Sequence, residues 1–246
     1  MLNKTVDEIK KEYDSQEYYD SWRDKSKYYN IITEITHRCI KENISFTSNE
    51  KRVLDAGCGT GRNIDLLLRL GAKKIIGVDL STSLINFAKN KFKDNKNIEL
   101  FNYNLENKLF FKDKSFDVII CCKTLPHIDN IKKVLNEFNR ILKDGGIMIL
   151  DFYSPYSFRR LFAKKGYLKY TRWDSVSKVK QYLKSENLQL VKVYGERTFM
   201  VTEFLVNYLG LYPFFRYIEN AFTNTFFNRF SGIYTIVIRK KLKQNI

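Results

Sequence analysis

The sequence predicts an α/β fold whose core is a doubly wound, mostly parallel β-sheet. Three observations carry this prediction. Short apolar runs of strand length alternate with helical patterns between about residues 51 and 150. The runs are continuously apolar, as in strands that are buried on both faces. A glycine-rich loop joins the first run to the first helical pattern. Strands and helices that alternate in this way form parallel sheets with right-handed crossovers.

The first strand and its loop give the strongest local signal. The apolar run at about 51–56 ends in Gly57-Cys58-Gly59-Thr60-Gly61, and a helical pattern follows over about 61–71. Glycines suit such a loop because the backbone must turn tightly and pass close beneath a ligand. The N–H groups at the start of the following helix favour a negatively charged ligand group, here a carboxylate.

The second strand, at about 74–79, ends on an acid. Asp79 lies 22 residues after Gly57, close to the spacing at which an acid hydrogen-bonds a ribose in dinucleotide-binding folds. The loop itself is G-x-G-x-G, however, and not the dinucleotide pattern G-x-G-x-x-G. The two features together predict a site for a ligand that contains a nucleoside.

The alternation continues along the chain. Five further strands are expected at about 97–103, 118–122, 147–150, 188–194 and 232–239. Ser81 is expected to cap the helix after the second strand, and a helix is expected at about 129–142. Asp144-Gly145-Gly146 is expected to form a turn, and Asp174 to cap a helix that ends near residue 185.

The chain resembles the class I S-adenosylmethionine-dependent methyltransferases, in their widespread small-molecule branch. The segment from Val53 to Gly61 is similar to the first motif of that family. The other segments that carry the resemblance are Phe116-Asp117-Val118-Ile119, Leu125-Pro126-His127-Ile128 and Arg140-Ile141-Leu142-Lys143-Asp144-Gly145-Gly146. The resemblance covers about residues 51–153.

The resemblance implies a Rossmann-like sheet of about seven strands in which the last strand runs antiparallel beside the sixth. It implies S-adenosyl-L-methionine as the cofactor, with the glycine loop at its methionine part and Asp79 at both ribose hydroxyls. Asn104 stands where the family often has an Asp that contacts the adenine amino group, and an amide oxygen can still accept that bond. The expected cofactor-binding residues are Asp55, Ala56, Gly57, Cys58, Gly59, Gly61, Asp79, Leu80, Asn104, Leu105, Lys123 and Leu125.

Two further parts of the chain flank this core. Residues 1–45 are expected to form an N-terminal helical lid, with an amphipathic helix at 21–43, and residues 46–246 the methyltransferase core. In similar methyltransferases the leader folds over the cofactor. Tyr18, Tyr19 and Trp22 are therefore lid candidates, although packing aromatics would look the same. Tyr18, Tyr19 and Tyr156 are the candidate substrate contacts.

Two segments of the core depart from the strand and helix alternation. Residues 154–172 are expected to form a cap over the carboxyl edge of the sheet, and residues 202–230 a helical insertion before the last strand. The insertion is rich in aromatic residues and contains Arg216 and Arg229. Three interpretations remain open: a cap on the core, a hydrophobic pocket for the acceptor, or a contact with a membrane surface.

Methyl transfer from a sulfonium is an in-line displacement, so the enzyme chiefly aligns the reactants and excludes water. The sequence therefore needs neither a nucleophile nor a metal, and we expect no metal site. If a base is needed, His127 is the first candidate because it follows the fourth strand and histidine titrates near neutral pH. An equally good interpretation is that His127 holds its loop. Asp151 and Tyr156 are weaker candidates.

The net charge of +16 is relevant to the kind of acceptor that the protein methylates. Such a charge is typical of proteins that bind nucleic acid or an anionic membrane, but here the lysines are dispersed and the composition is that of AT-rich coding. The fourth strand ends without the N-P-P-Y segment of base methylation, and the chain has no Pro-Cys nucleophile motif. We expect methylation of an oxygen or nitrogen on a small-molecule or lipid-like acceptor. RNA methylation is the alternative.

The cysteines, the first residues and the lengths of the apolar runs indicate the cellular compartment. The four cysteines form no C-x-x-C pair, which favours a reducing compartment without disulfides or zinc. The first residues lack the apolar core of a signal peptide, and no apolar run reaches the length of about 18 residues that spans a bilayer. We expect a cytoplasmic protein.

Overall fold

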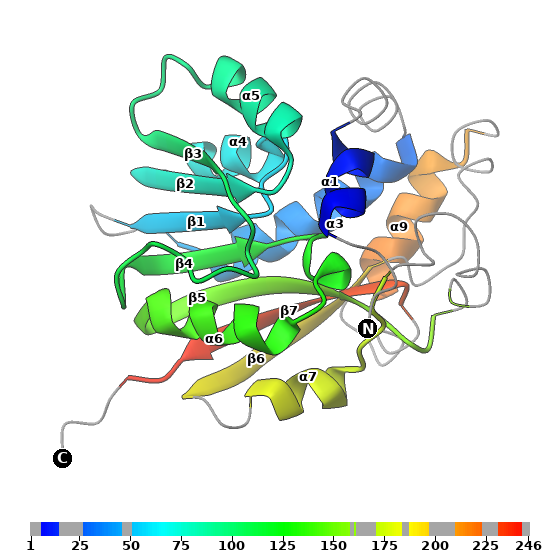
Figure 1. The fold of residues 1–246 in the computed structure, drawn as a ribbon. Helices are drawn as coiled ribbons and strands as arrows, with labels where there is room; N and C mark the ends of the chain where they lie inside the picture. Colours follow the sequence, from blue (N-terminus) through cyan, green and yellow to red (C-terminus); the bar gives the residue numbers. More distant parts are fainter. Residues whose placement is uncertain are drawn as a thin grey trace.

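A seven-stranded sheet forms the centre of the computed structural model, with the strand order β3-β2-β1-β4-β5-β7-β6 (Figure 1). The structure describes residues 6–14, 27–45, 51–157, 160, 171–183, 187–196, 210–222 and 231–242. The strands are β1 (Arg52–Ala56), β2 (Lys74–Asp79), β3 (Ile98–Asn102), β4 (Phe116–Cys121), β5 (Leu142–Tyr153), β6 (Leu188–Glu196) and β7 (Ile233–Lys240). The strands from β1 to β5 pair in parallel. Strand β7 lies antiparallel between β5 and β6, so the predicted sheet is confirmed.

Helices cover both faces of this sheet (Figure 1). They are α1 (Val6–Tyr13), α3 (Lys27–Asn43), α4 (Arg62–Arg69), α5 (Thr82–Lys91), the short 3₁₀ helix η1 (Leu125–His127), α6 (Ile131–Ile141), α7 (Val176–Leu183) and α9 (Tyr212–Phe222). Successive strand residues point to opposite faces. Val53 therefore joins one buried cluster with side chains of α3, α4 and α5. Leu54 joins the other cluster, with α6 and α7.

The second half of the leader is part of this core. Cys39, Ile40 and Ile44 are buried in the same cluster as Val53 and Val237. At the far edge of the sheet, the Tyr194 hydroxyl donates to Glu42 Oε2 at 2.8 Å. Helix α3 is thereby fixed against the sheet by apolar packing and by a hydrogen bond. The division of the chain at residue 45 stays a prediction.

Two of the sequence predictions about helix starts can be compared with the structure. Ser81 caps α5 as expected, because its Oγ accepts a hydrogen bond from the Leu84 amide at 3.2 Å. The prediction for Asp174 is wrong, since the Lys178 amide donates to Ser175 Oγ instead, at 3.2 Å. The Asp174 carboxylate is buried and pairs with Arg172 at 3.1 Å and Lys178 at 2.8 Å. The Asp174 carboxylate therefore pairs with two cations, and Ser175 caps the helix in its place.

The predicted turn at 144–146 is also wrong. Strand β5 begins at Leu142 and includes this segment as an irregular stretch. Leu142 pairs with Phe116, and the next aligned pair is Ile147 with Val118. Gly145 takes a φ of +78° there, which is a conformation that favours glycine. The extra residues therefore bulge out of the strand and do not end it.

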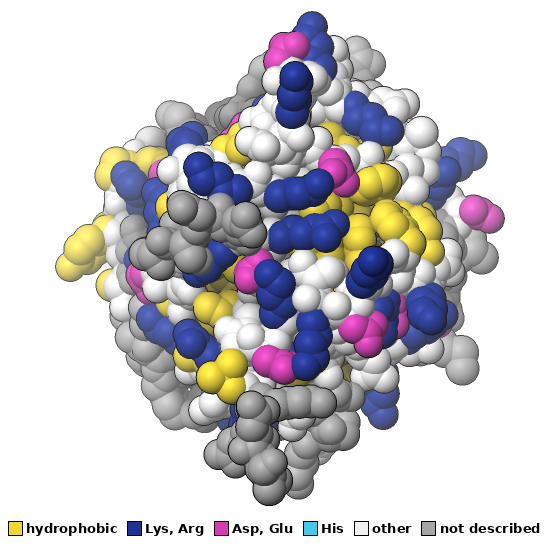
Figure 2. Space-filling model, turned by 90° about the vertical axis from the view of Figure 1, so that its left-hand side faces the viewer, with side chains coloured by type: hydrophobic (Ala, Val, Ile, Leu, Met, Phe, Trp, Pro, Cys, Tyr) yellow, Lys and Arg dark blue, Asp and Glu magenta, His cyan; other side chains and the backbone are white. Residues whose placement is uncertain are grey.

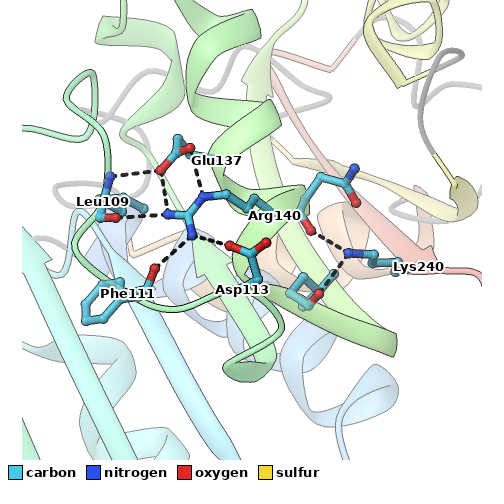
Figure 3. A network of polar contacts seen from close by, with 8 residues as sticks. Leu109, Phe111, Asp113, Glu137, Arg140 and Lys240 are labelled. Carbon is cyan, nitrogen blue, oxygen red and sulfur yellow. Dashed lines mark hydrogen bonds and ion pairs between the residues drawn. The ribbon is translucent and has the colours of Figure 1, made fainter.

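Arg140 of α6 joins the loop between β3 and β4 to the core (Figure 3). Its guanidinium donates to the carbonyl oxygens of Leu109 at 2.9 Å and Phe111 at 2.8 Å. It also donates to Asp113 at 2.7 Å and to both carboxylate oxygens of Glu137. Glu137 in turn accepts from the Leu109 amide at 2.9 Å. A planar group with five donors can hold this irregular backbone, whereas a lysine could not.

We expect Arg140→Met to lower the free energy of unfolding by about 2–4 kcal/mol, because it removes charged hydrogen bonds, leaves two carbonyls without this donor and leaves Glu137 without its cation. Urea unfolding at pH 7 measures the effect. The matched control is Lys89→Met on the exposed side of α5, with an expected change within about 0.5 kcal/mol. Equal stability of the parent and the Arg140 variant would contradict this role.

Helix α9 comes from the predicted insertion and lies beside α3 (Figure 1). Tyr212 donates to Glu34 Oε1 at 3.0 Å, and Arg216 pairs with the other oxygen of Glu34 at 2.6 Å. The outer side of α9 is apolar and open to solvent, with Phe214 56% and Tyr217 74% exposed. Residues 202–209 and 223–230 of the insertion, and most of the predicted cap at 154–172, lie outside the described residues.

Basic side chains are numerous on the side of the molecule where the parallel strands begin, and acidic side chains lie among them (Figure 2). At these strand starts Lys74 pairs with Glu99 at 2.5 Å and Lys114 with Asp144 at 2.6 Å. The positive charge is thus partly neutralised locally. Among the described residues, no helix combines the length and apolar character needed to cross a bilayer.

Candidate active site

A cleft lies at the edge of the sheet where β1, β2, β3 and β4 end. It encloses about 1200 Å³ of space between protein atoms, including the part open to solvent. Its walls come from α1, α3, the glycine loop, the start of α4, the segments after β2, β3 and β4, and η1. In open α/β sheets, ligands bind beyond the carboxyl ends of the strands, where the strand order reverses. Here that point lies between β1 and β4.

The glycine loop forms the floor of the cleft. The amides of Gly57 and Cys58 both donate to the Val78 carbonyl, at 2.6 and 3.1 Å. Gly57 takes a φ of +78°, and a Cβ there would lie 1.9 Å from Thr124 Oγ1. The loop therefore passes against the end of β4 with no room for a side chain, which leaves its backbone facing the cleft.

Asp79 faces the cleft from the end of β2. Its Oδ2 accepts from the Gly59 amide and its Oδ1 from the Ser81 amide, both at 2.9 Å. Burial raises the pKa of this carboxyl above its ordinary value, and hydrogen bonds from the backbone amides of Ser81, Gly59 and Leu80 oppose that shift. Each carboxylate oxygen has two lone pairs, so each keeps capacity for a second donor. The arrangement presents two fixed acceptors side by side.

Asp55 lies behind the glycine loop and is fully buried. Asn63 of α4 contacts its Oδ1 at 3.4 Å, while its Oδ2 has no hydrogen-bond partner among the described residues. Burial raises the pKa of Asp55 to about 7. A buried carboxyl without a full set of donors is costly, and such groups concentrate at functional sites.

The cleft brings together most of the predicted cofactor residues. Eight of them line it: Gly57, Cys58, Gly59, Asp79, Leu80, Asn104, Leu105 and Lys123. Asp55, Ala56 and Leu125 are fully buried behind the cleft wall, and Gly61 is the N-cap residue of α4. The amide oxygen of Asn104 accepts from the Glu106 amide at 2.9 Å, which orders the loop after β3. Its expected contact with adenine stays a prediction.

The candidates for catalysis and for substrate contact are more scattered. His127 lines the cleft from η1. Asp151 is fully buried and accepts from Thr235 Oγ1 at 2.6 Å, and it is not among the described lining residues. Tyr156 is 63% exposed and is likewise not among them. Tyr18, Tyr19 and Trp22 lie outside the described residues.

Sequence reasoning missed one wall of the cleft. Thr33, Thr36 and His37 of α3 line it, together with Lys10 of α1 and Arg62 of α4. Arg62 donates to Thr33 Oγ1 at 3.0 Å and so ties α3 to the glycine-loop side. The spacing i, i+3, i+4 of the three α3 residues is a helical stripe. This polar stripe lies next to the apolar stripe of Ile35 and Cys39, and it is the sequence signal that could have identified this wall of the cleft.

The comparisons with known proteins agree with this geometry. A family model described as a methyltransferase domain matches residues 54–150. An uncharacterized protein of Methanocaldococcus jannaschii is 33% identical over 197 residues, which cover 77% of this chain and 69% of that protein. The chain belongs to the class I S-adenosylmethionine-dependent methyltransferases. It is an enzyme of that family.

Two other relatives of this methyltransferase have names that state an activity. The demethylmenaquinone methyltransferase of Tropheryma whipplei is 36% identical over 129 residues, or 52% of each chain. The ubiquinone biosynthesis O-methyltransferase of Pelagibacter ubique is 33% identical over 146 residues, or 55% of this chain and 59% of the relative. The methyltransferase thus spans little more than half the length of these two relatives.

The fold of this methyltransferase is also found among solved structures. An S-adenosylmethionine-dependent methyltransferase of Thermotoga maritima superposes with a TM-score of 0.65 at 20% identity. The match covers 92% of this chain and 96% of that one. At this identity the likeness concerns the fold alone, and it agrees with the seven-stranded sheet described above.

Proposed function

We propose that this enzyme transfers the methyl group of S-adenosyl-L-methionine to an oxygen or nitrogen atom of a small-molecule or lipid-like acceptor. The observation that carries the proposal is the single cleft that runs from Asp79 and the glycine loop to Lys123 and His127. When bound there, the cofactor would supply an electrophilic methyl group. The protein would supply alignment and the exclusion of water.

The residues at one end of the cleft fit this cofactor. The two Asp79 oxygens suit the two hydroxyls of a ribose, because both are fixed by backbone amides and retain lone pairs. At Gly59 an added Cβ would meet only the Leu84 side chain, at 4.0 Å, so this part of the loop has space beside it for the methionine part. The buried carboxyl of Asp55 behind the loop, with its unpartnered Oδ2, would favour a cation such as the cofactor's ammonium group on the cleft side of the loop.

The other end of the cleft suits the acceptor. Lys123 takes a φ of +63° at the end of β4, and strained backbone of this kind is concentrated at functional sites. His127 and Ile128 line the cleft just beyond it. We propose that His127 contacts the acceptor there. An aromatic or quinone-like ring would match the mixed apolar and polar lining.

The names of the relatives support a small-molecule acceptor. One is named a demethylmenaquinone methyltransferase, and the other is named a ubiquinone biosynthesis O-methyltransferase. RNA remains the alternative, motivated by the net charge of +16. The ion pairs on the basic side of the molecule make that alternative less favourable.

The cofactor is tested first, by calorimetric titration of the purified chain with S-adenosylmethionine, S-adenosylhomocysteine and NADH. We expect the first two to bind with dissociation constants of about 1–100 μM, and NADH not to bind. Saturation by NADH alone would contradict the proposal.

The acceptor is tested next, with S-adenosylmethionine labelled in its methyl group. The panel is catechol, a short-chain quinol in liposomes, an aromatic primary amine and bulk RNA. We expect label in catechol, the quinol or the amine. Label in RNA alone would replace the proposal by the nucleic-acid alternative.

A further inference from the structure

His37 lines the cleft, and one of its ring nitrogens has no hydrogen-bond partner among the described residues. The residue lies on α3 and lines the cleft with Thr33 and Thr36. Its Nε2 atom is buried and has no hydrogen-bond partner among the described residues. Buried polar atoms in folded proteins are nearly always paired, so each exception calls for an explanation. A partner on a bound ligand is the explanation that the position of this atom suggests.

Four cations, which come from three elements of the fold, lie close enough to this imidazole to affect its charge. Lys123 follows β4, Arg62 and Arg69 belong to α4, and Lys41 lies one turn further along α3. The nearby acid on α3, Glu34, is engaged by Tyr212 and Arg216 of α9. Burial and these four cations lower the pKa of His37 to about 4. The ring is therefore neutral at pH 7, and one of its nitrogens is an acceptor.

The neighbours of His37 also place it along the cleft. Arg62 begins α4, directly after the glycine loop, and Lys123 follows β4. Both lie close enough to His37 to affect its charge. Asp79 and Asn104, by contrast, mark the end of the cleft where we place the ribose and adenine. His37, Arg62 and Lys123 all belong to the wall of the cleft, and we place the methyl group and the acceptor on this side.

We propose that His37 Nε2 accepts the hydrogen bond of the attacking O–H or N–H group of the acceptor and takes its proton during methyl transfer. The inference rests on the proposed function. In the step, the acceptor atom forms its bond to the methyl carbon while the carbon–sulfur bond breaks and its electron pair stays on sulfur. The proton of the acceptor moves to His37, which then releases it to water. His37 is thus a catalytic residue that faces the acceptor from α3.

The first test needs no acceptor. The chain has two histidines, so a sample labelled with ¹⁵N in histidine gives two ring systems in NMR, and the His127→Gln variant assigns them. With S-adenosylhomocysteine bound, we expect the His37 ring to stay neutral down to about pH 4. A His37 ring that is protonated at pH 7 would overturn the inference, because it could accept neither the hydrogen bond nor the proton.

The second test uses the panel member that the parent enzyme methylates. We expect His37→Gln, which can accept a hydrogen bond but not a proton, to lower kcat by about 10²–10⁴-fold. Its dissociation constant for S-adenosylhomocysteine should stay within about threefold of that of the parent, since the residue does not bind the cofactor. Adding the acceptor to the parent should shift the His37 Nε2 resonance.

The outcomes separate the two proposals. If the parent methylates no small molecule of the panel, the proposed function fails and this inference fails with it. If the parent methylates one and His37→Gln is equally fast, only the inference fails. A variant that binds S-adenosylhomocysteine much more weakly would make His37 a cofactor residue and would also overturn the inference.

Discussion

Asp79→Ala is expected to weaken the binding of S-adenosylmethionine by at least about 100-fold. Hydrogen bonds to charged groups contribute about 1.5–3 kcal/mol each, and we propose that this carboxylate makes two of them to the ribose. The substitution also frees the amides of Gly59 and Ser81, which Asp79 now holds at 2.9 Å. The loop would lose its order in the same change. Calorimetric titration with S-adenosylmethionine measures the effect.

Two companion variants make this result specific. Asp79→Asn keeps one acceptor and should fall between the parent and the alanine variant. Asp65→Ala removes an acid of α4 whose side chain is 40% exposed and pairs with Lys91, so it should bind like the parent. Thermal unfolding of each variant shows whether the fold is intact. An alanine variant that is folded and binds as tightly as the parent would refute the ribose assignment.

Asp55→Asn is expected to stabilise the ligand-free enzyme at pH 8. The pKa of Asp55 is about 7 in the folded chain, against an ordinary value of 3.8 for an exposed aspartate. Between these values the folded state holds a proton that the unfolded state has lost, so stability falls as the pH rises through this range. Above pH 7 the penalty is fully present. It amounts to at most about 4 kcal/mol, since one pKa unit is equivalent to about 1.4 kcal/mol.

Urea unfolding of the parent and Asp55→Asn at pH 5, 6, 7 and 8 tests this directly. The difference in stability should grow with pH and level off above pH 7. The matched control, Asp65→Asn on the exposed side of α4, should follow the parent at every pH. Parallel curves for the parent and Asp55→Asn would show that Asp55 does not titrate in this range.

The same substitution should weaken cofactor binding. An amide cannot supply the negative charge that Asp55 places behind the glycine loop, so we expect the affinity for the cationic cofactor to be about 10- to 150-fold lower. The ligand-free enzyme would thus gain stability while the complex loses it. Such opposite effects are typical of a residue that is kept for function at the expense of stability. Calorimetry at pH 8 provides the measurement, and unchanged affinity would remove Asp55 from the site.

Where the sequence predictions were right, they depended on neighbouring residues. The loop from Gly57 to Gly61, the acid at Asp79 and the cap at Ser81 are each defined by a few consecutive side chains and a strand or helix period. Where they were wrong, the local pattern allowed two outcomes and the packing selected the other one. Ser175 caps the helix while Asp174 is buried with Arg172 and Lys178, and the segment at 144–146 bulges within β5, outside the aligned pairs with β4.

The sequence by itself determined the order of strands and helices, the glycine loop and the acid that follows the second strand. Local periodicity and backbone freedom are sufficient for these features. Only the tertiary structure decided that α3 turns His37 toward the cleft, that Asp55 is fully buried, and that Arg140 holds the loop after β3. The physical reason is that burial, desolvation and long-range ion pairs depend on residues brought together from distant parts of the chain.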